Sequence, residues 1–209
     1  MFSDLRHDIG RCGGSPGERW REVVFNTGFW AVASYRIRRR MFLARGPKPL
    51  RMILSLAGMI LKTATEVVTH VEIPASVAIG PGFYIAHTGT VVLNSSTSMG
   101  ANCTISTNVA IGHARGGGRA GCPRIGDRVY IGPGAILIGP ITVGEDALIA
   151  PGAIVTRSVE PRAVVAGNPG RPISWRGSFD LIEYPGMDSD PARQASLNLC
   201  RQDIRNRKD

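Results

Sequence analysis

The histidine with the most informative surroundings is His87, the third residue of the segment IAHTGT (residues 85–90). Its neighbours Thr88 and Gly89 are small enough to leave the imidazole ring accessible. His87 could therefore act as a general base that removes a proton from a hydroxyl group. A lone histidine is more often an exposed residue or a satisfied core residue, so the residue type alone does not make His87 catalytic.

The other reactive side chains form weaker patterns. His113 lies at the start of a glycine-rich segment, ARGGGRAGCP (residues 114–123). Such a loop can be an idle connector, but a loop that leaves a rigid scaffold is also where binding groups often lie. The four cysteines are scattered and form no CxxC pair, so no zinc site is indicated. The segment GGSPG (residues 13–17) fits the letters GxSxG but lies in the polar N-terminal segment and follows no predicted strand, so no nucleophile elbow with a serine nucleophile is indicated.

The elements that must position these residues are indicated by a six-residue period. Residues 125–160 divide into the units IGDRVY, IGPGAI, LIGPIT, VGEDAL, IAPGAI and VTRSVE, each opened by an aliphatic residue. The same frame runs backwards through Val109, Cys103, Thr97, Val91, Ile85, Ile79 and Ile73. This period is typical of a solenoid in which each unit is one short strand and one corner. Three units would close one coil, so these units predict a little over four coils.

The repeats, together with the ending VAGNPGRP (residues 165–172), resemble the hexapeptide-repeat acyltransferase superfamily. Within it, residues 72–170 are similar to serine acetyltransferase and to its relatives from polysaccharide gene clusters, the polysaccharide-biosynthesis O-acetyltransferases. The resemblance implies a mainly β fold, a left-handed parallel β-helix with a short N-terminal α-helical region and an external loop at residues 114–124. The left hand of the winding comes from the resemblance and not from the period.

The resemblance also implies catalytic roles. The segment AHTGTVV (residues 86–92) matches the family's DHATGIV, which places His87 on the catalytic histidine, and Glu72 falls on the aspartate that orients it. Fifteen residues separate the two, close to the eighteen of one coil, so both side chains are expected within reach of each other on adjacent coils. The carboxylate would then fix the imidazole tautomer. The alternative for Glu72 is a solvated carboxylate of the first coil.

The reaction implied by the family is direct transfer of the acetyl group of acetyl-CoA to an acceptor hydroxyl, with no metal ion. In the family the CoA arm lies in a groove between two subunits of a trimer, where small residues admit the arm and arginines can meet the phosphates. The cofactor-binding candidates are Gly112, Pro133, Gly134, Pro151, Gly152, Thr156, Arg157 and Arg171. For any single glycine, a role in the corner alone is an equal alternative.

The substrate-side candidates are His113, Arg119 and Cys122, and here the resemblance is weakest. The family's carboxylate-binding arginine and histidine are replaced by Gly121 and Cys122, and the aspartate before the catalytic histidine is replaced by Ala86. Each lost charge-assisted hydrogen bond should cost about 1.5 to 3 kcal/mol. We therefore expect the acceptor to be a saccharide hydroxyl, as in polysaccharide or glycoconjugate biosynthesis, with L-serine as the alternative.

Two further classes stay open. A non-catalytic hexapeptide-repeat scaffold would have the same period. A hexapeptide-repeat carbonic anhydrase would need three metal-binding histidines, two of them close in sequence, but His70, His87 and His113 are 17 and 26 residues apart.

The chain divides into an N-terminal α-helical region (residues 1–70), the β-helix (71–177) and a C-terminal tail (178–209). Residues 1–18 are polar and glycine-rich and are expected to be loose. One helix is predicted from Thr27, as N-cap, up to the GPKP segment, and a second over about residues 50–68. A further helix is predicted in the tail from Pro191 onward.

The net charge of +9 is concentrated near the N-terminus, because residues 1–70 carry 12 basic and 5 acidic side chains. Arg36, Arg38, Arg39 and Arg40 are expected to form a solvated helix end, and the alternative is contact with an anionic membrane surface or a lipid-linked substrate. Nothing resembles a nucleic-acid-binding module, and the N-terminus has no apolar stretch of the kind found in a signal peptide. The longest apolar run, residues 52–61, is half the length of roughly 20 residues that a membrane span needs, so no membrane span is expected. A cytoplasmic homotrimer is expected.

Overall fold

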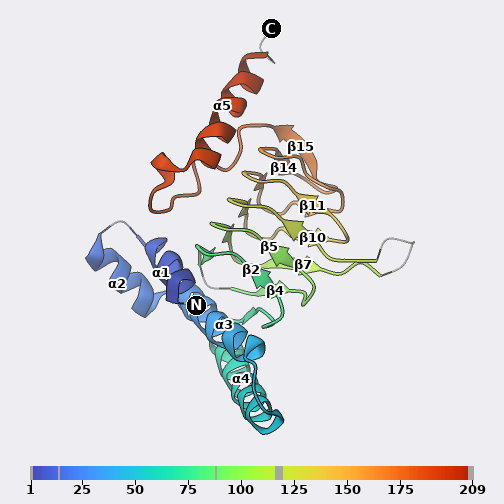
Figure 1. The fold of residues 1–209 in the computed structure, drawn as a ribbon. Helices are drawn as coiled ribbons and strands as arrows, with labels where there is room; N and C mark the ends of the chain where they lie inside the picture. The colour runs from blue at the N-terminus through green and yellow to red at the C-terminus, as the bar shows by residue number, and fades with distance from the viewer. Residues whose placement is uncertain (1, 14, 88, 116–119, 207–209) are drawn as a thin grey trace.

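The computed structural model describes residues 2–13, 15–87, 89–115 and 120–206. From β1 onward the chain winds into a parallel β-helix with three short strands per turn (Figure 1). Sheet A contains β1 (Val71–Glu72), β4 (Val91–Leu93), β7 (Val109–Gly112), β10 (Ile136–Ile138) and β13 (Ile154–Val155). Sheet B contains β2 (Ala78–Ile79), β5 (Ser98–Met99), β8 (Arg124–Ile125) and β11 (Thr142–Val143). Sheet C contains β3 (Tyr84–Ile85), β6 (Thr104–Ile105), β9 (Tyr130–Ile131), β12 (Leu148–Ile149), β14 (Val164–Ala166) and the antiparallel β15 (Arg171–Ser174).

The core confirms the solenoid that the six-residue period predicts. On each face of the β-helix, two residues that are two positions apart both point inward, and the next such inward-facing pair follows six residues later. The buried pairs of the later turns are Val129 and Ile131, Ala135 and Leu137, Ile141 and Val143, Ala147 and Ile149, and Ala153 and Val155. Sheets A and C each reach five parallel levels, because β1 precedes the first counted unit of sheet A and the winding continues beyond the last counted unit of sheet C to β14, which pairs with β12.

The period count is wrong at one corner. Ile85 pairs with Ile105, twenty residues later, whereas strands of the third turn pair with strands eighteen residues later. The inward-facing residue equivalent to Ile85 on the next face is Leu93, eight residues on, and not Val91. The first turn therefore contains two additional residues, and they lie in the corner that carries His87.

Four helices precede the β-helix: α1 (Phe2–Gly10), α2 (Pro16–Phe25), α3 (Thr27–Leu43) and α4 (Lys48–Thr69). The two predicted helices are confirmed as α3 and α4, but the N-cap of α3 is Asn26 and not Thr27, because the Asn26 side chain accepts a 2.8 Å hydrogen bond from the N–H of Gly28. The expectation of a loose N-terminus is wrong. Asp8 of α1 is buried and accepts a 2.8 Å hydrogen bond from the N–H of Phe83, which ties this helix to the first turn.

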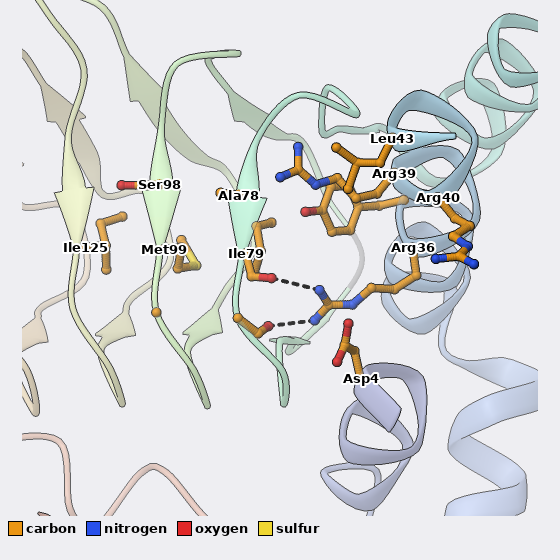
Figure 2. Close-up of a pocket in the computed structure, with 13 residues that line it drawn as sticks. Asp4, Arg36, Arg39, Arg40, Leu43, Ala78, Ile79, Ser98, Met99 and Ile125 are labelled. Carbon is orange, nitrogen blue, oxygen red and sulfur yellow. Dashed lines mark hydrogen bonds between the residues drawn. The ribbon is translucent and has the colours of Figure 1, made fainter. Parts of the chain in front are cut away.

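Arg36, in the middle of α3, is buried against the first turn of the β-helix instead of facing solvent. Its guanidinium binds both carboxylate oxygens of Asp8, at 2.8 and 3.0 Å. It also donates to the carbonyls of Ile79 at 2.8 Å and Gly80 at 2.6 Å (Figure 2). Burial alone would lower the pKa of Arg36, but the bonds to Asp8 outweigh it and raise that pKa. The first turn has no preceding turn whose N–H groups could bind its outward carbonyls, and Arg36 supplies donors to two of them.

Two more arginines of α3 act in the same way. Arg38 is buried and donates to the carbonyl of Ile73 at 3.0 Å, and Arg39 donates to two carbonyls of the following corner at 3.0 and 2.7 Å. The predicted solvated helix end is therefore wrong for three of the four arginines, and only Arg40 is exposed.

The C-terminal tail packs along the other end of the β-helix. It contains the short helix η1 (Met187–Ser189) and α5 (Pro191–Asn206), which confirms the helix predicted from Pro191. Arg128 is buried in a corner, binds Asp146 at 2.7 Å, and its carbonyl accepts a 2.6 Å hydrogen bond from the hydroxyl of Ser178. These contacts fix the start of the tail against the middle turns.

Candidate active site

His87 lies in the enlarged corner between β3 and β4, where the backbone leaves the regular winding. Its φ is +114°, and φ of Gly89 is +149°. A Cβ on Gly89 would come within 1.7 Å of Oγ1 of Thr107, in the corresponding corner of the next turn, so the corner stacks tightly only with glycine. The side chain of His87 is exposed, and Thr88 lies outside the described residues.

His87 lines an open cavity of about 850 Å³ between this corner and α2. The other lining residues are Gly13, Arg21, Glu22, Phe25, Asn26 and Tyr84. The cavity has the size of a small-molecule site, and it presents an imidazole, a carboxylate and a guanidinium together. A polar, zwitterionic or hydroxylated ligand suits this lining better than an apolar one.

A close contact at Gly28 lets α3 begin directly against this corner. A Cβ on Gly28 would lie 2.6 Å from the carbonyl oxygen of Ile85, so glycine allows α3 to begin directly beside β3. Asn26, the N-cap, donates to Oε2 of Glu22 at 2.7 Å and so fixes the carboxylate at the cavity wall. Burial raises the pKa of Tyr84, and the neighbouring Glu22 raises it further.

The sequence reasoning missed these cavity residues, although one signal for the helix that carries them was present. The segment SPGE (residues 15–18) has the pattern of a capping box, with proline at the first helical position, and α2 begins at Pro16. That pattern predicts a helix but not its contact with His87. The contact depends on the approach of α3 to β3, which is a tertiary feature.

Glu72, the predicted orienting carboxylate, lies on β1 with a side chain that is 48% exposed. Its carboxylate lies 3.5 Å from Nζ of Lys62 on α4, and Lys62 also pairs with Glu66 at 3.4 Å. Within the described part of the chain, no hydrogen bond or ion pair joins Glu72 to His87. The pairing of Glu72 with His87 therefore stays a prediction, and in the single chain the partner of Glu72 is Lys62.

The corners between sheets C and A stack into one edge of the β-helix, and this edge carries His87 and half of the predicted cofactor-binding residues. The N–H of Gly134 donates to the carbonyl of Thr107 at 3.0 Å, and the N–H of Gly152 donates to that of Pro133 at 2.8 Å. A Cβ added to Gly152 would meet no atom within 4 Å, so the edge is open at this height. The predicted residues placed here are Pro133, Gly134, Pro151 and Gly152.

The remaining candidates lie elsewhere. His113 follows β7, and Thr156 and Arg157 follow β13, so these three lie on the edge between sheets A and B. Gly112 is the last residue of β7 and pairs with Ile138, whereas Arg171 lies on β15. Arg119 lies outside the described residues. Within one chain, sheet A therefore lies between the candidates on the edge with His87 and the candidates on the edge with His113.

Cys122 is buried at the base of the external loop. Its Sγ donates to Oδ1 of Asn94 at 3.1 Å, and burial raises the pKa of the thiol. These contacts suit a residue that anchors the loop, and its predicted role in substrate binding has no support from them. In the described ranges no group of three or more His, Cys, Asp or Glu side chains could hold a metal ion.

Residues 122–157 match the family model described as bacterial transferase hexapeptide (six repeats). The winding and this match define a hexapeptide-repeat transferase. The serine acetyltransferase of Bacillus pumilus is 31% identical over 180 residues, which cover 85% of this chain and 79% of the relative. The serine acetyltransferase of Mycobacterium tuberculosis is 39% identical over 121 residues, which cover 56% of this chain and 53% of the relative. The chain belongs to the serine acetyltransferase family.

Solved structures of the family share the fold. Neisseria gonorrhoeae serine acetyltransferase in complex with serine gives a TM-score of 0.67 at 28% identity, over 83% of this chain and 67% of that chain. Brucella abortus serine acetyltransferase in complex with coenzyme A gives 0.68 at 27% identity, over 81% of this chain and 66% of that chain. The predicted left-handed parallel β-helix is thereby confirmed. The chain spans about half the length of the Mycobacterium tuberculosis relative, 53%.

Proposed function

We propose that this protein is an acetyl-CoA-dependent O-acetyltransferase in which His87 is the general base. The observation that carries the proposal is the place of His87, exposed in the one corner that breaks the early winding, beside an open cavity. The same edge carries the open corners at Pro133–Gly134 and Pro151–Gly152, where a CoA arm could approach the backbone. The coenzyme A complex of a relative supports the choice of donor.

The reaction follows from these positions. His87 takes the proton of the acceptor hydroxyl, whose oxygen attacks the thioester carbonyl of acetyl-CoA. The carbon–sulfur bond then breaks, the acetyl group stays on the acceptor oxygen, and the proton passes to the sulfur of CoA. Glu72 would hold the imidazole in the reactive tautomer if assembly or substrate releases it from Lys62.

L-serine is the first candidate acceptor, in place of the saccharide expected from the sequence. The relatives compared above are named serine acetyltransferases, and one was solved in complex with serine. The cavity supports this choice, because Arg21 and Glu22 offer a cation for a carboxylate and a carboxylate for an ammonium group. These two side chains could replace the charged partners that are absent at Ala86, Gly121 and Cys122.

A saccharide hydroxyl is the second candidate. It is favoured by the uncharged residues at those three positions and by the enclosed thiol of Cys122, which leaves that side of the site without a charged partner. A neutral, hydroxyl-rich acceptor needs no charges there. Glu22 and Asn26 could then accept and donate hydrogen bonds to sugar hydroxyls.

The test is acetyl-CoA consumption with L-serine, nucleotide sugars and lipid-linked oligosaccharides offered in parallel. With serine as acceptor, Glu22→Gln and Arg21→Gln should each raise KM for serine about tenfold or more, since each removes a charge-assisted hydrogen bond. With a sugar as acceptor, both variants should change KM by less. Failure to bind acetyl-CoA in calorimetry would favour the non-catalytic scaffold and overturn the proposal.

Assembly into a homotrimer belongs to the same proposal. The outer face of sheet A is apolar, with Val92 and Ile138 exposed and Ile136 and Ile154 partly exposed, so it offers a surface to a second copy. A neighbouring copy could bring the edge with His113 and Arg157 against the edge with His87. A stable, fully active monomer in sedimentation would contradict this assembly. A reducing cytoplasm fits the four cysteines, which are all buried free thiols.

A further inference from the structure

The α3–α4 hairpin ends in a surface that the rest of the described chain leaves uncovered. We define the hairpin tip as residues 40–60, which comprise the last residues of α3, the connection and the first half of α4. Figure 1 shows α4 projecting beyond the first turn of the β-helix, on the side away from α5. Its large apolar side chains that are more than half exposed are Phe42, Leu43, Met52, Ile53, Leu56, Met59 and Ile60. So large an apolar patch marks an interaction surface.

The charge of the hairpin tip has one sign. Between residues 23 and 65 the chain contains no Asp or Glu, and the tip carries Arg40, Arg45, Lys48 and Arg51. Among the described residues, none of these four side chains makes a hydrogen bond or an ion pair, in contrast to Arg36, which is engaged with Asp8. Their charges are therefore free to meet anions.

A groove between α3 and α4 combines the two features. It has a volume of about 740 Å³ and is lined by Met41, Phe42, Met52 and Met59, with Lys48, Arg51 and Lys62 also on its wall. Flexible methionine side chains adapt to irregular apolar partners. An apolar floor beside cations is complementary to an amphiphile with an anionic head and a hydrocarbon tail.

The hairpin tip can enter a membrane surface, but α4 is held too firmly to cross it. The expectation that no segment is long enough for a membrane span is wrong for α4, which by length and composition alone could span a bilayer; only 6% of its most apolar stretch is buried. Its C-terminal end runs directly into β1, and it packs along α3, whose Arg36 and Arg38 are buried against the first turn. A spanning α4 would have to separate from α3 and the first turn. Shallow insertion of the tip needs no such change.

We propose that the hairpin tip docks this protein onto an anionic lipid surface, with the apolar side chains inserted among the lipids and Arg40, Arg45, Lys48 and Arg51 at the head groups. The charge favours lipid over a second copy of the chain, because two tips would bring eight unpaired cations together. Each basic residue adds to the attraction of an anionic bilayer. The inference does not depend on which acceptor is acetylated.

The test is sedimentation of the full-length protein with vesicles of phosphatidylcholine alone or of phosphatidylcholine mixed with phosphatidylglycerol. The mixed vesicles should bind at least about tenfold more strongly at low salt, and raising the salt from about 0.1 M to about 1 M should weaken binding, because the Debye length falls from about 10 to about 3 Å. The triple variant Arg45→Glu/Lys48→Glu/Arg51→Glu should lose at least about tenfold in binding. The variant Met52→Ser/Ile53→Ser/Leu56→Ser should lose the binding that survives high salt.

The matched control is Arg124→Glu/Arg176→Glu/Arg201→Glu, which changes the net charge by the same amount at exposed positions outside the tip. This control should bind mixed vesicles nearly as well as the natural chain. Equal loss in both charge variants would show a non-specific effect of net charge and overturn the proposal. Equal binding to both kinds of vesicle would overturn it as well. A change of oligomeric state in the tip variants, without vesicle binding by the natural chain, would assign the tip to contact between copies.

Discussion

Two corners on the same edge of the β-helix differ in backbone conformation and in packing, and only one of them carries a side chain that could act as a base. The corner at Gly152 follows the six-residue period, with an ordinary left-handed glycine at φ +67° and open space beside it. The corner at His87 contains two more residues, has φ values of +114° and +149°, and is wedged against Thr107. Regular turns supply the scaffold, and the proposed general base lies where the regularity fails.

The sharpest test of this comparison is His87→Ala. Removal of a general base should lower kcat about 10²- to 10⁴-fold, while the free energy of unfolding and the affinity for acetyl-CoA stay nearly constant, because the side chain is exposed. Steady-state kinetics and calorimetry on the same preparation would measure all three. His113→Ala is the matched control, expected to change KM more than kcat. The comparison fails if His113→Ala abolishes turnover while His87→Ala retains it.

The next largest effect is expected at the closed end of the first turn. Arg36→Ala leaves the carboxylate of Asp8 buried without its cation, which should lower the free energy of unfolding by about 3 to 5 kcal/mol. Chemical denaturation would measure the loss. Asp8→Ala/Arg36→Ala should recover part of it, because no uncompensated charge remains. A loss below 1 kcal/mol in the single variant would mean that α1 and α3 contribute little to the first turn.

Glu72→Gln distinguishes the two partners available to this carboxylate. If Glu72 orients His87 in the active assembly, kcat should fall roughly 10- to 100-fold, the equivalent of one charge-assisted hydrogen bond of about 1.5 to 3 kcal/mol. Lys62→Ala removes the partner seen in the single chain and should leave kcat nearly unchanged. Because the pair is half-exposed, its contribution to stability should be small. Unchanged turnover in Glu72→Gln would assign the residue to the ion pair alone.

The smallest effects concern the glycines of the two corners. Gly89→Ala should cost about 1 to 3 kcal/mol of stability and reduce kcat, because its φ is strained for alanine and Thr107 must move. Gly152→Ala has open space and should cost about 1 kcal/mol with kcat unchanged. Thermal unfolding and kinetics would be measured together. Equal loss of activity in both variants would remove the distinction between the two corners.

The sequence predicts the late turns well, because inward-facing side chains at a fixed spacing are a local property of the chain. The same reasoning fails at Val91, which is aliphatic and happens to lie six residues after Ile85. The six-residue count therefore continues through Val91 and does not detect the two additional residues of this corner. It also fails for Arg36, whose charge suggests solvent until Asp8 and the first-turn carbonyls are placed around it. The histidine of the site could be found from its small neighbours. Glu22 could not, because only the packing of α3 on β3 brings it there.

The arginines of α3 have a consequence for growth of the assembly. A parallel β-helix ends in exposed strands, and such ends can pair with the strands of another molecule and extend into a fibre. Here one terminus is occupied by guanidinium groups on the first-turn carbonyls, and at the other β15 lies antiparallel on β14. These contacts disfavour polymerisation along the axis by strand addition at either end, and they favour association of copies side by side, in closed and finite oligomers.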